Sequence, residues 1–184
     1  QYEWWHAEMI GDWQDGLIRA AFLTGEPKAR EKVERYVSDI LKSQDEDGYI
    51  GIYPKGFRFH FGICDGELWS QRCALLGLLA YYEFTGDRRV REAVERAAQC
   101  TLKAYRDRTY FHRPKPDGGV AHGIGYMDTL EWLYRLTGKE VYRQGALWLY
   151  HDLASAPMAF ISDLMPETLA DPSQPWRNHT PHIM

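Results

Sequence analysis

The segment Leu136-Thr137-Gly138-Lys139 has two earlier counterparts in the chain, Leu23-Thr24-Gly25-Glu26 and Phe84-Thr85-Gly86-Asp87. Each consists of an apolar residue, Thr, Gly and a charged residue. The threonines are separated by 61 and then 52 residues, which is enough for two helices and a loop in each interval. A Gly just past a helix end supplies the left-handed conformation that closes the last turn, and a charge or Pro begins the next helix. The repeat therefore predicts a series of α/α hairpins.

The segments on the two sides of each turn differ in polarity. Before the turns, Leu17 to Leu23 and Leu75 to Tyr82 are apolar around the whole helical circumference, which indicates buried helices. After the turns, a single apolar stripe opposes a charged face, as in a helix that packs on one side only. A buried inner ring within an amphipathic outer ring is an α/α toroid. The stripe residues are Ala29, Val33, Tyr36, Val37, Ile40 and Leu41, then Val90, Val94, Ala97, Thr101 and Tyr105, then Val141, Gly145, Trp148, Leu149 and Leu153.

We therefore expect an all-α fold, an α/α-hairpin toroid in which about three hairpins are visible and which forms half of an (α/α)6 barrel. Residues 1–184 are expected to form a partial toroid catalytic domain, with hairpins at about 4–43, 66–106 and 122–155. Residues 156–184 contain several prolines and are expected to form a loop that leads to a fourth inner helix. The alternative is a complete helical bundle with a ragged end.

Charge and hydropathy exclude two classes of partner. The formal net charge is −4, from 22 basic and 26 acidic residues spread along the chain, so no cationic face is set aside for nucleic acid. The longest apolar run, Ala74 to Tyr82, is about half the roughly 18 residues of a membrane span, so we expect a soluble protein without a membrane partner. No signal peptide is visible at Gln1, and the cell compartment is unknown.

The three cysteines, Cys64, Cys73 and Cys100, form no CxxC pair. An odd number without this spacing argues against a disulfide framework and against a zinc knuckle. We therefore expect reduced thiols, no metal site and no cofactor in this chain.

Candidate substrate-binding residues gather at the rim opposite to the Thr-Gly turns. There the long connections 43–66, 106–123 and 154–182 join each outer helix to the next inner one, and long loops commonly carry sites. The chain is 14% aromatic, and aromatic rings offer flat apolar faces that also stack on sugar rings. A polar, aromatic-lined cleft is predicted from the residues near the N-terminal ends of the inner helices. These are Trp5, His6, Trp69, Arg72, His122 and Tyr126.

Counting back from each turn Thr aligns the inner helices with one another. Glu8, Asp12 and Asp15 then fall on one helical face, because offsets of four and three residues bring side chains together. This acidic stripe lines the cleft in one interpretation, whereas in the other Asp12 and Asp15 pair locally with Arg19. Hydrolysis of a glycosidic bond usually uses two carboxyl groups, and the candidate catalytic residues are Glu8, Asp12, Asp15, Glu67 and Asp128. Sixteen residues before the turn Thr, the aligned positions are Glu8, Trp69 and Ala121. Twelve residues before it they are Asp12, Cys73 and Gly125, and nine residues before it they are Asp15, Leu76 and Asp128.

Three segments carry a resemblance to a known family. The stretch from Glu67 to Asp87 resembles the second inner helix of the β-L-arabinofuranosidase-like glycoside hydrolases, members of the six-hairpin glycosidase superfamily. Gln44 to Tyr49 resembles their Q-x-x-DGY loop, and Leu133 to Gly138 their LYR-x-TG turn. The resemblance covers nearly the whole chain, as the N-terminal part of a catalytic toroid.

The resemblance implies further site residues. Asp47 and Tyr49 of the DGY loop are expected to bind substrate, Cys73 replaces a substrate-binding His of the family, His122 lies one place from a second, and His182 matches a third. In the family, the catalytic Cys, its zinc-binding partners and the acidic residue come from the later half of the toroid. Zinc is therefore implied only where the remaining half carries such a cysteine cluster.

The resulting hypothesis is a glycoside hydrolase that cleaves a plant or microbial carbohydrate, with this chain forming part of the sugar-binding cleft. Two alternatives stay open, namely a sugar epimerase or polysaccharide lyase on the same toroid, and a non-catalytic carbohydrate-binding or helical scaffold fragment. Besides a carbohydrate, the expected partner is the remaining half of the toroid or a second copy of the chain, because an open ring leaves inner-helix faces uncovered.

Overall fold

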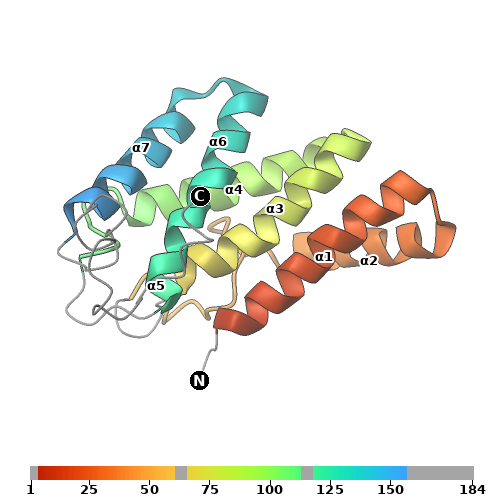
Figure 1. Ribbon diagram of the computed structural model, residues 1–184, viewed down its shortest axis with the longest axis horizontal. Coiled ribbons are helices and arrows are strands. Elements are labelled where there is room, and N and C mark those ends of the chain that lie inside the picture. The colour runs from red at the N-terminus through yellow and green to blue at the C-terminus, as the bar shows by residue number, and fades with distance from the viewer. Residues whose placement is uncertain (1–3, 61–65, 113–117, 157–184) are drawn as a thin grey trace, which may run out of the picture.

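The computed structural model describes residues 4–60, 66–112 and 118–156, and within these ranges every regular element is a helix (Figure 1). The prediction of an all-α hairpin fold is confirmed. In the same residues, no helix is both long enough and apolar enough to cross a membrane. The elements are α1 (Trp4–Thr24), α2 (Pro27–Ser43), α3 (Glu67–Thr85), α4 (Arg88–Ala104), α5 (Gly118–His122), the 3₁₀ turn η1 (Gly123–Gly125), α6 (Tyr126–Thr137) and α7 (Glu140–Ser155).

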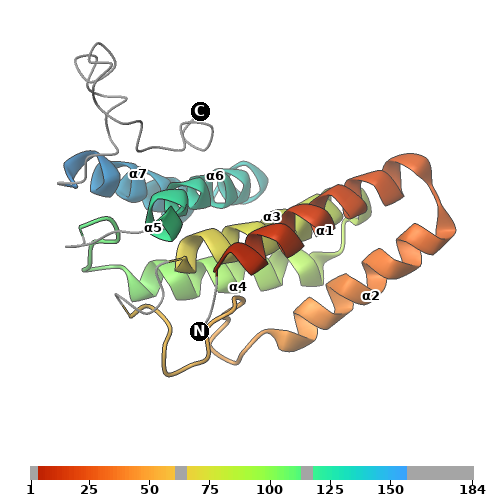
Figure 2. The same ribbon diagram turned by 60° about the horizontal axis from the view of Figure 1, so that its bottom comes forward.

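The helices form an inner row and an outer row. Helix α3 packs against α1 on one side and against α5, η1 and α6 on the other, and each inner helix also contacts the outer helix that follows it in sequence. Figure 2 shows α2, α4 and α7 on the outer side of the curved row formed by α1, α3 and α6. Helix α3 is buried along most of its length, as its uniformly apolar sequence predicts. The three hairpins are therefore a segment of an α/α toroid.

The three Thr-Gly turns share one set of hydrogen bonds. Their glycines have φ between +66° and +71°, which is the left-handed region that closes a helix. At the second turn, the Thr85 hydroxyl donates to the carbonyl of Tyr81 at 2.8 Å and accepts from the backbone N–H of Asp87 at 3.2 Å. The first and third turns repeat both bonds. The Thr thus satisfies one group of the inner helix and one of the outer helix.

The third inner helix differs from the expectation, since it begins at Gly118 and is interrupted by η1. The cause is close packing at two glycines. A Cβ atom on Gly123 would lie 2.4 Å from Cε1 of Tyr110, and one on Gly125 would lie 2.8 Å from Cζ3 of Trp69. Glycine also favours the α-helix least of the ordinary residues. The interruption therefore brings this backbone unusually close to α3.

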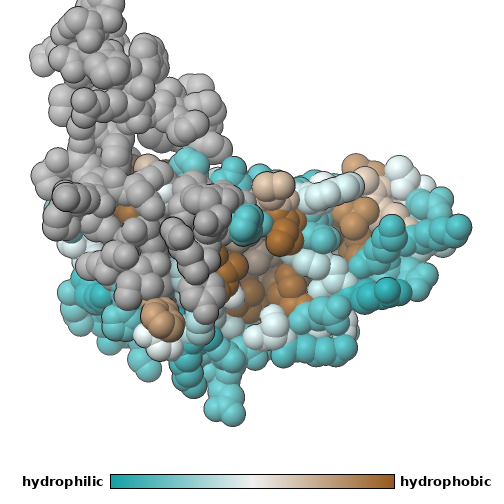
Figure 3. All heavy atoms as spheres, turned by 90° about the horizontal axis from the view of Figure 1, so that it is seen from below, coloured by the Kyte–Doolittle hydropathy of each residue, from teal (hydrophilic) through white to brown (hydrophobic). Residues whose placement is uncertain are grey.

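Two helix faces differ from the predicted burial. On α7, Tyr142 is buried whereas Val141, which was assigned to the apolar stripe, is exposed. On α1, Leu23 is exposed, as are Met9, Ile10 and Trp13, the last with 72% of its surface accessible. Helix α1 packs on α2 and α3, and Figure 3 shows uncovered apolar side chains along the face seen from below, where α1 runs. This exposed face of α1 is defined here by Met9, Ile10 and Trp13.

Adding a methyl group at two glycines should shift stability in opposite directions. Gly86→Ala places a Cβ in the left-handed region (φ +68°) and should lower the free energy of unfolding by about 1 kcal/mol. Gly16 lies inside α1 with no atom within 4 Å of an added Cβ, so Gly16→Ala should raise it by about 0.5–1 kcal/mol. Urea unfolding followed by circular dichroism measures both. Shifts of the same sign would contradict the role given to Gly86.

The exposed face of α1 should make the isolated 184-residue chain associate, because contiguous apolar surface is removed from water by self-association. Ile10→Ser combined with Trp13→Ser should lower the average molar mass measured by multi-angle light scattering. Leu147→Ser, which changes an exposed apolar residue of α7, is the matched control and should leave it unchanged. A wild-type chain that is monomeric at all concentrations would contradict this expectation.

Candidate functional site

The N-terminal ends of the three inner helices meet at a carboxylate. The indole Nε1–H of Trp69, in the first turn of α3, donates to Oε2 of Glu8 on α1 at 2.9 Å. Nδ1 of His122, at the end of α5, lies 3.8 Å from the same oxygen. The Trp69 and His122 rings are in edge contact, with centroids 5.1 Å apart. Trp69 of the second hairpin therefore bonds Glu8 of the first, and His122 of the third lies beside it, while the Glu8 side chain remains 29% exposed.

A second polar contact lies beside the first. The guanidinium of Arg72 is 4.6 Å from the centroid of the Trp69 ring, and its Nη2 donates to Oδ2 of Asp128 on α6 at 3.1 Å. The Arg72 side chain is mostly buried, whereas Asp128 is exposed. An exposed ion pair of this kind contributes about 0–1 kcal/mol to stability, so Asp128 can accept a ligand hydroxyl at little cost. Glu8, Trp69, Arg72, His122 and Asp128 are called the Glu8 cluster below.

Trp69 and His122 are buried behind the exposed side chains of this cluster, so their rings do not offer a face to a ligand. Trp69 is only 3% exposed, because Gly125 and Arg72 pack on its ring. His122 is also buried. We therefore revise the prediction that both contact substrate directly, since their positions suit them to orient Glu8 and Arg72.

The remaining acidic candidates of α1 behave differently from Glu8. Asp15 accepts both hydrogen bonds from Nε of its neighbour Arg19, the shorter at 2.9 Å. This agrees with the alternative in which Asp15 pairs locally. Asp12 is exposed on the same helical face as Glu8, so it is accessible to a ligand.

Two predicted site residues are packing residues in the structure. Cys73 is buried where α1 crosses α3, and a Cβ on Gly11 would lie only 2.5 Å from the Cys73 Cβ. Burial raises the pKa of this thiol to about 12, which disfavours the nucleophilic thiolate at neutral pH. Tyr126 is fully enclosed at the start of α6, and burial raises its pKa as well. We reassign both from substrate binding to the core.

The DGY loop is also structural. The guanidinium of Arg58 lies 3.8 Å from the Tyr49 ring centroid, pairs with Asp45 and Asp47, and donates from Nε to the carbonyl of Tyr53 at 3.0 Å. The pairing with Arg58 lowers the pKa of Asp45. Asp47 is thus held by Arg58, and Tyr49 is buried. The substrate-binding role expected for Asp47 and Tyr49 stays a prediction, and in the structure both residues contact Arg58.

Glu67 links this loop to the start of α3. Its carboxylate is 0% exposed and accepts from the Tyr49 hydroxyl at 2.6 Å, the Gln71 amide at 2.9 Å and the backbone N–H of Phe59 at 3.2 Å. Burial raises the pKa of Glu67, while these donors oppose the rise. A carboxylate enclosed in this way does not reach a substrate, so Glu67 is removed from the catalytic candidates. It fixes the helix turn that carries Trp69.

The structure gives less information on three further predicted site residues. Trp5 lies in the first turn of α1, and His6 is exposed one residue later. Both belong to the end of α1 that carries Glu8. His182 lies outside the described residues.

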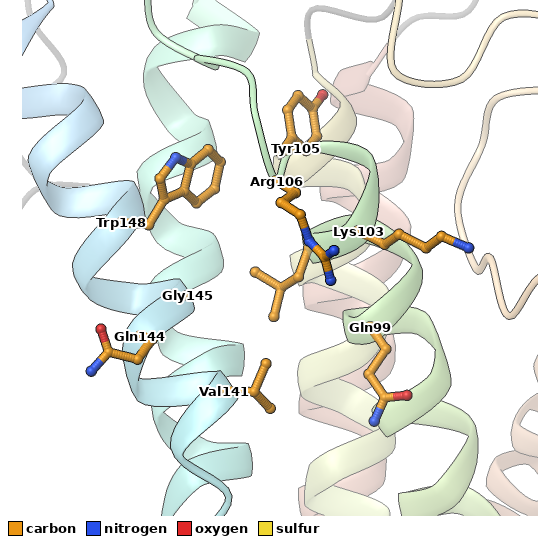
Figure 4. Close-up of a pocket in the computed structure, with 9 residues that line it drawn as sticks. Gln99, Lys103, Tyr105, Arg106, Val141, Gln144, Gly145 and Trp148 are labelled. Carbon is orange, nitrogen blue, oxygen red and sulfur yellow. The ribbon is translucent and has the colours of Figure 1, made fainter.

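A separate groove of about 470 Å³ lies between α4 and α7 in the outer row. In Figure 4, Trp148 of α7 points toward the gap between the two helices, whereas Lys103 on the α4 side extends away from it. Its lining contains no carboxylate. Because hydrolysis of a glycosidic bond by protein side chains generally depends on carboxyl groups, this groove does not compete with the Glu8 cluster as a catalytic site.

Sequence reasoning missed Arg58, the residue that organises the DGY loop. An isolated Arg gives no periodic signal. The available signal was charge, since Arg58 follows three acidic residues at 45–47 within one loop.

The three α/α hairpins and the carboxylate-bearing inner side define an all-helical domain of the toroid glycosidase type. The chain matches, over residues 3–178, the model of the family described as Beta-L-arabinofuranosidase, GH127 catalytic domain, and it belongs to that family. The family resemblance read from the sequence is thereby confirmed. No curated protein matches the chain.

Removal of the Tyr49 hydroxyl should lower the free energy of unfolding by an amount that depends on pH. Folding raises the pKa of Glu67 above its ordinary 4.5, so its contribution to stability is full below that value and declines as the pH rises through the folded pKa. Tyr49→Phe removes a donor that opposes this rise, so the decline should deepen. We expect a loss of about 1–3 kcal/mol at pH 8 and a smaller loss at pH 5, measured by urea unfolding.

The control is Tyr150→Phe, which removes the hydroxyl of an exposed tyrosine on α7. It should change stability little at either pH. An equal loss for Tyr49→Phe at pH 5 and pH 8 would show that the protonation state of Glu67 in the folded protein does not change over this range, which would contradict the expectation.

Proposed function

We propose that this chain supplies one sugar-binding wall of a glycoside hydrolase that acts on arabinofuranosides, with Glu8, Arg72 and Asp128 contacting the sugar hydroxyls. The observation that carries the proposal is the convergence of three hairpins on one accessible carboxylate. Trp69 and His122 hold Glu8 from neighbouring hairpins, and the family membership supplies the substrate class.

The cluster has complementary donors and acceptors for a sugar. Glu8 has one oxygen held by Trp69, which leaves acceptor positions for a hydroxyl group. Arg72 has only donors, and Asp128 only acceptors when ionised. Hydrogen bonds to charged groups contribute roughly 1.5–3 kcal/mol each, and groups fixed in advance lose little entropy on binding. The wall is therefore suited to orient a sugar ring rather than only to attract it.

No group of three His, Cys, Asp or Glu residues within 4–60, 66–112 and 118–156 could hold a metal ion. Cys73, which follows Arg72 of the Glu8 cluster in sequence, is a buried thiol whose pKa is raised to about 12. Zinc, where the enzyme uses it, would supply its chemistry from other residues, and we assign to this wall binding and orientation only.

Glu8→Gln should lower kcat/KM of the full-length protein on para-nitrophenyl β-L-arabinofuranoside by about 10–100-fold, the loss expected for one charged hydrogen bond. His122→Ala should lower it less, because Trp69 still holds Glu8. The matched control is Glu31→Gln, which changes an exposed carboxylate of α2 that pairs only with Arg35. The assay is release of nitrophenol under substrate-limiting conditions.

If Glu8→Gln and His122→Ala both leave kcat/KM unchanged, the Glu8 cluster does not bind the sugar. Analysis of the products decides between reaction classes. An unsaturated sugar would indicate a lyase and an isomerised, uncleaved sugar an epimerase, and either product would replace the hydrolase in this proposal. Sugar binding without turnover would indicate a non-catalytic module.

A further inference from the structure

A second convergence of the three hairpins lies nearer the Thr-Gly turns, at Trp132 of α6. Its indole Nε1–H donates to Oε1 of Glu83 on α3 at 2.6 Å. The guanidinium of Arg19 on α1 lies 5.8 Å from the Trp132 ring centroid. The ring is thus fixed at its edge by one hairpin and approached at its face by another.

Arg19 and Trp132 stand in the same register, five residues before the Thr of their respective turns. The residue of α3 at this register is Ala80, whose small side chain leaves room for Arg19 to reach across the helix. The contact between Glu8 and His122 also joins the first and third hairpins across α3. Both contacts therefore lie on one side of the inner row, and the outer helices α2, α4 and α7 lie on the other.

A groove of about 380 Å³ opens at this place, lined by Glu83, Asp128, Glu131, Trp132, Arg135 and Leu136. Asp128 belongs both to this groove and to the Glu8 cluster through its bond with Arg72. The groove and the Glu8 cluster therefore share one residue. Glu131 and Arg135 form an exposed ion pair of 2.6 Å, which is worth little in water and leaves both groups available to a ligand.

We propose that this groove is a second sugar subsite, so that the ligand is an oligosaccharide extending from the Glu8 cluster past Asp128 to Trp132. The inference rests on the proposed function and adds the length of the substrate to it. A tryptophan ring stacks on the apolar face of a sugar ring, while carboxylates and guanidiniums bond its hydroxyls. Trp132 follows Asp128 by four residues within α6, which is roughly 6 Å along the helix axis at 1.5 Å per residue. A sugar held at Asp128 and a second sugar on the Trp132 ring would therefore be neighbours in one oligosaccharide.

The test measures affinity against ligand length. The full-length protein is titrated by calorimetry with methyl β-L-arabinofuranoside and with β-linked L-arabinofuranose oligosaccharides of two to four units. The wild-type Kd should fall by about tenfold once the ligand reaches Trp132. The ratio of the Kd for short ligands to the Kd for long ligands is therefore about ten in the wild type. Trp132→Ala should reduce this ratio to about one, and Trp132→Phe should retain most of it because a flat ring remains.

Control variants separate binding from folding. Tyr150→Ala removes an exposed aromatic residue of the outer row and should leave the ratio intact. Glu131→Gln and Arg135→Gln alter only exposed groove side chains and should each reduce the ratio by about threefold, while circular dichroism melting monitors the fold of every variant.

The outcomes distinguish this inference from the function on which it rests. A ratio near one in the wild type, or one that survives in Trp132→Ala and in both groove variants, overturns the second subsite while short glycosides still bind and turn over. If no glycoside of any length binds or is cleaved, the proposed function fails and the subsite fails with it.

Discussion

The burial of α3 on all sides is the constraint on which the rest of the structure depends. A polar side chain inside a protein is costly unless it finds a hydrogen-bond partner, and α3 carries Glu67, Trp69, Gln71 and Arg72 within its first two turns. Each of these finds its partner on another element. Glu67 bonds the DGY loop, Trp69 bonds α1, Gln71 accepts from Thr101 of α4 at 2.6 Å, and Arg72 bonds α6.

These bonds make the polar start of α3 the point at which the hairpins are placed relative to one another. Apolar contacts along the rest of the helix tolerate small displacements, whereas a buried carboxylate with three donors does so only by losing one of them. Glu67 therefore fixes the first turn of α3, and that turn carries Trp69 toward Glu8. The candidate site is in this sense a consequence of how the second hairpin is buried.

The repeat allowed the fold to be predicted, and the register allowed part of the site to be predicted. The Thr-Gly turns have a local physical cause, a left-handed glycine and a threonine that bonds two helices, so they are visible in sequence. The shared offset of sixteen residues placed Glu8 beside Trp69 without any structure. The same counting at five residues aligns Arg19 with Trp132, a pair that was overlooked because neither residue lies at the rim assigned to the cleft.

Burial within the site could not be read from the sequence. Trp69 and Cys73 share the register of accessible residues, yet Gly125 packs closely on Trp69 and Gly11 on Cys73. A glycine in sequence signals either a flexible position or a close contact, and only the packing decides between the two. The contacts of Asp47 and Tyr49 with Arg58 could not be predicted for a related reason, because the spacing of these loop residues follows no helical or strand period.

The polar groups of the inner side follow one line rather than forming one point. Glu8 with Trp69, Arg72 with Asp128, and Trp132 with Glu83 succeed one another along α3 from its first turn to its last. A site that served only the cleavage of one bond would need polar groups at one end of this line, with apolar side chains along the remainder. This row of charged side chains constrains the nature of the ligand. Carboxylates and guanidiniums on an inner face are stable only where water or a hydroxyl-rich chain contacts them.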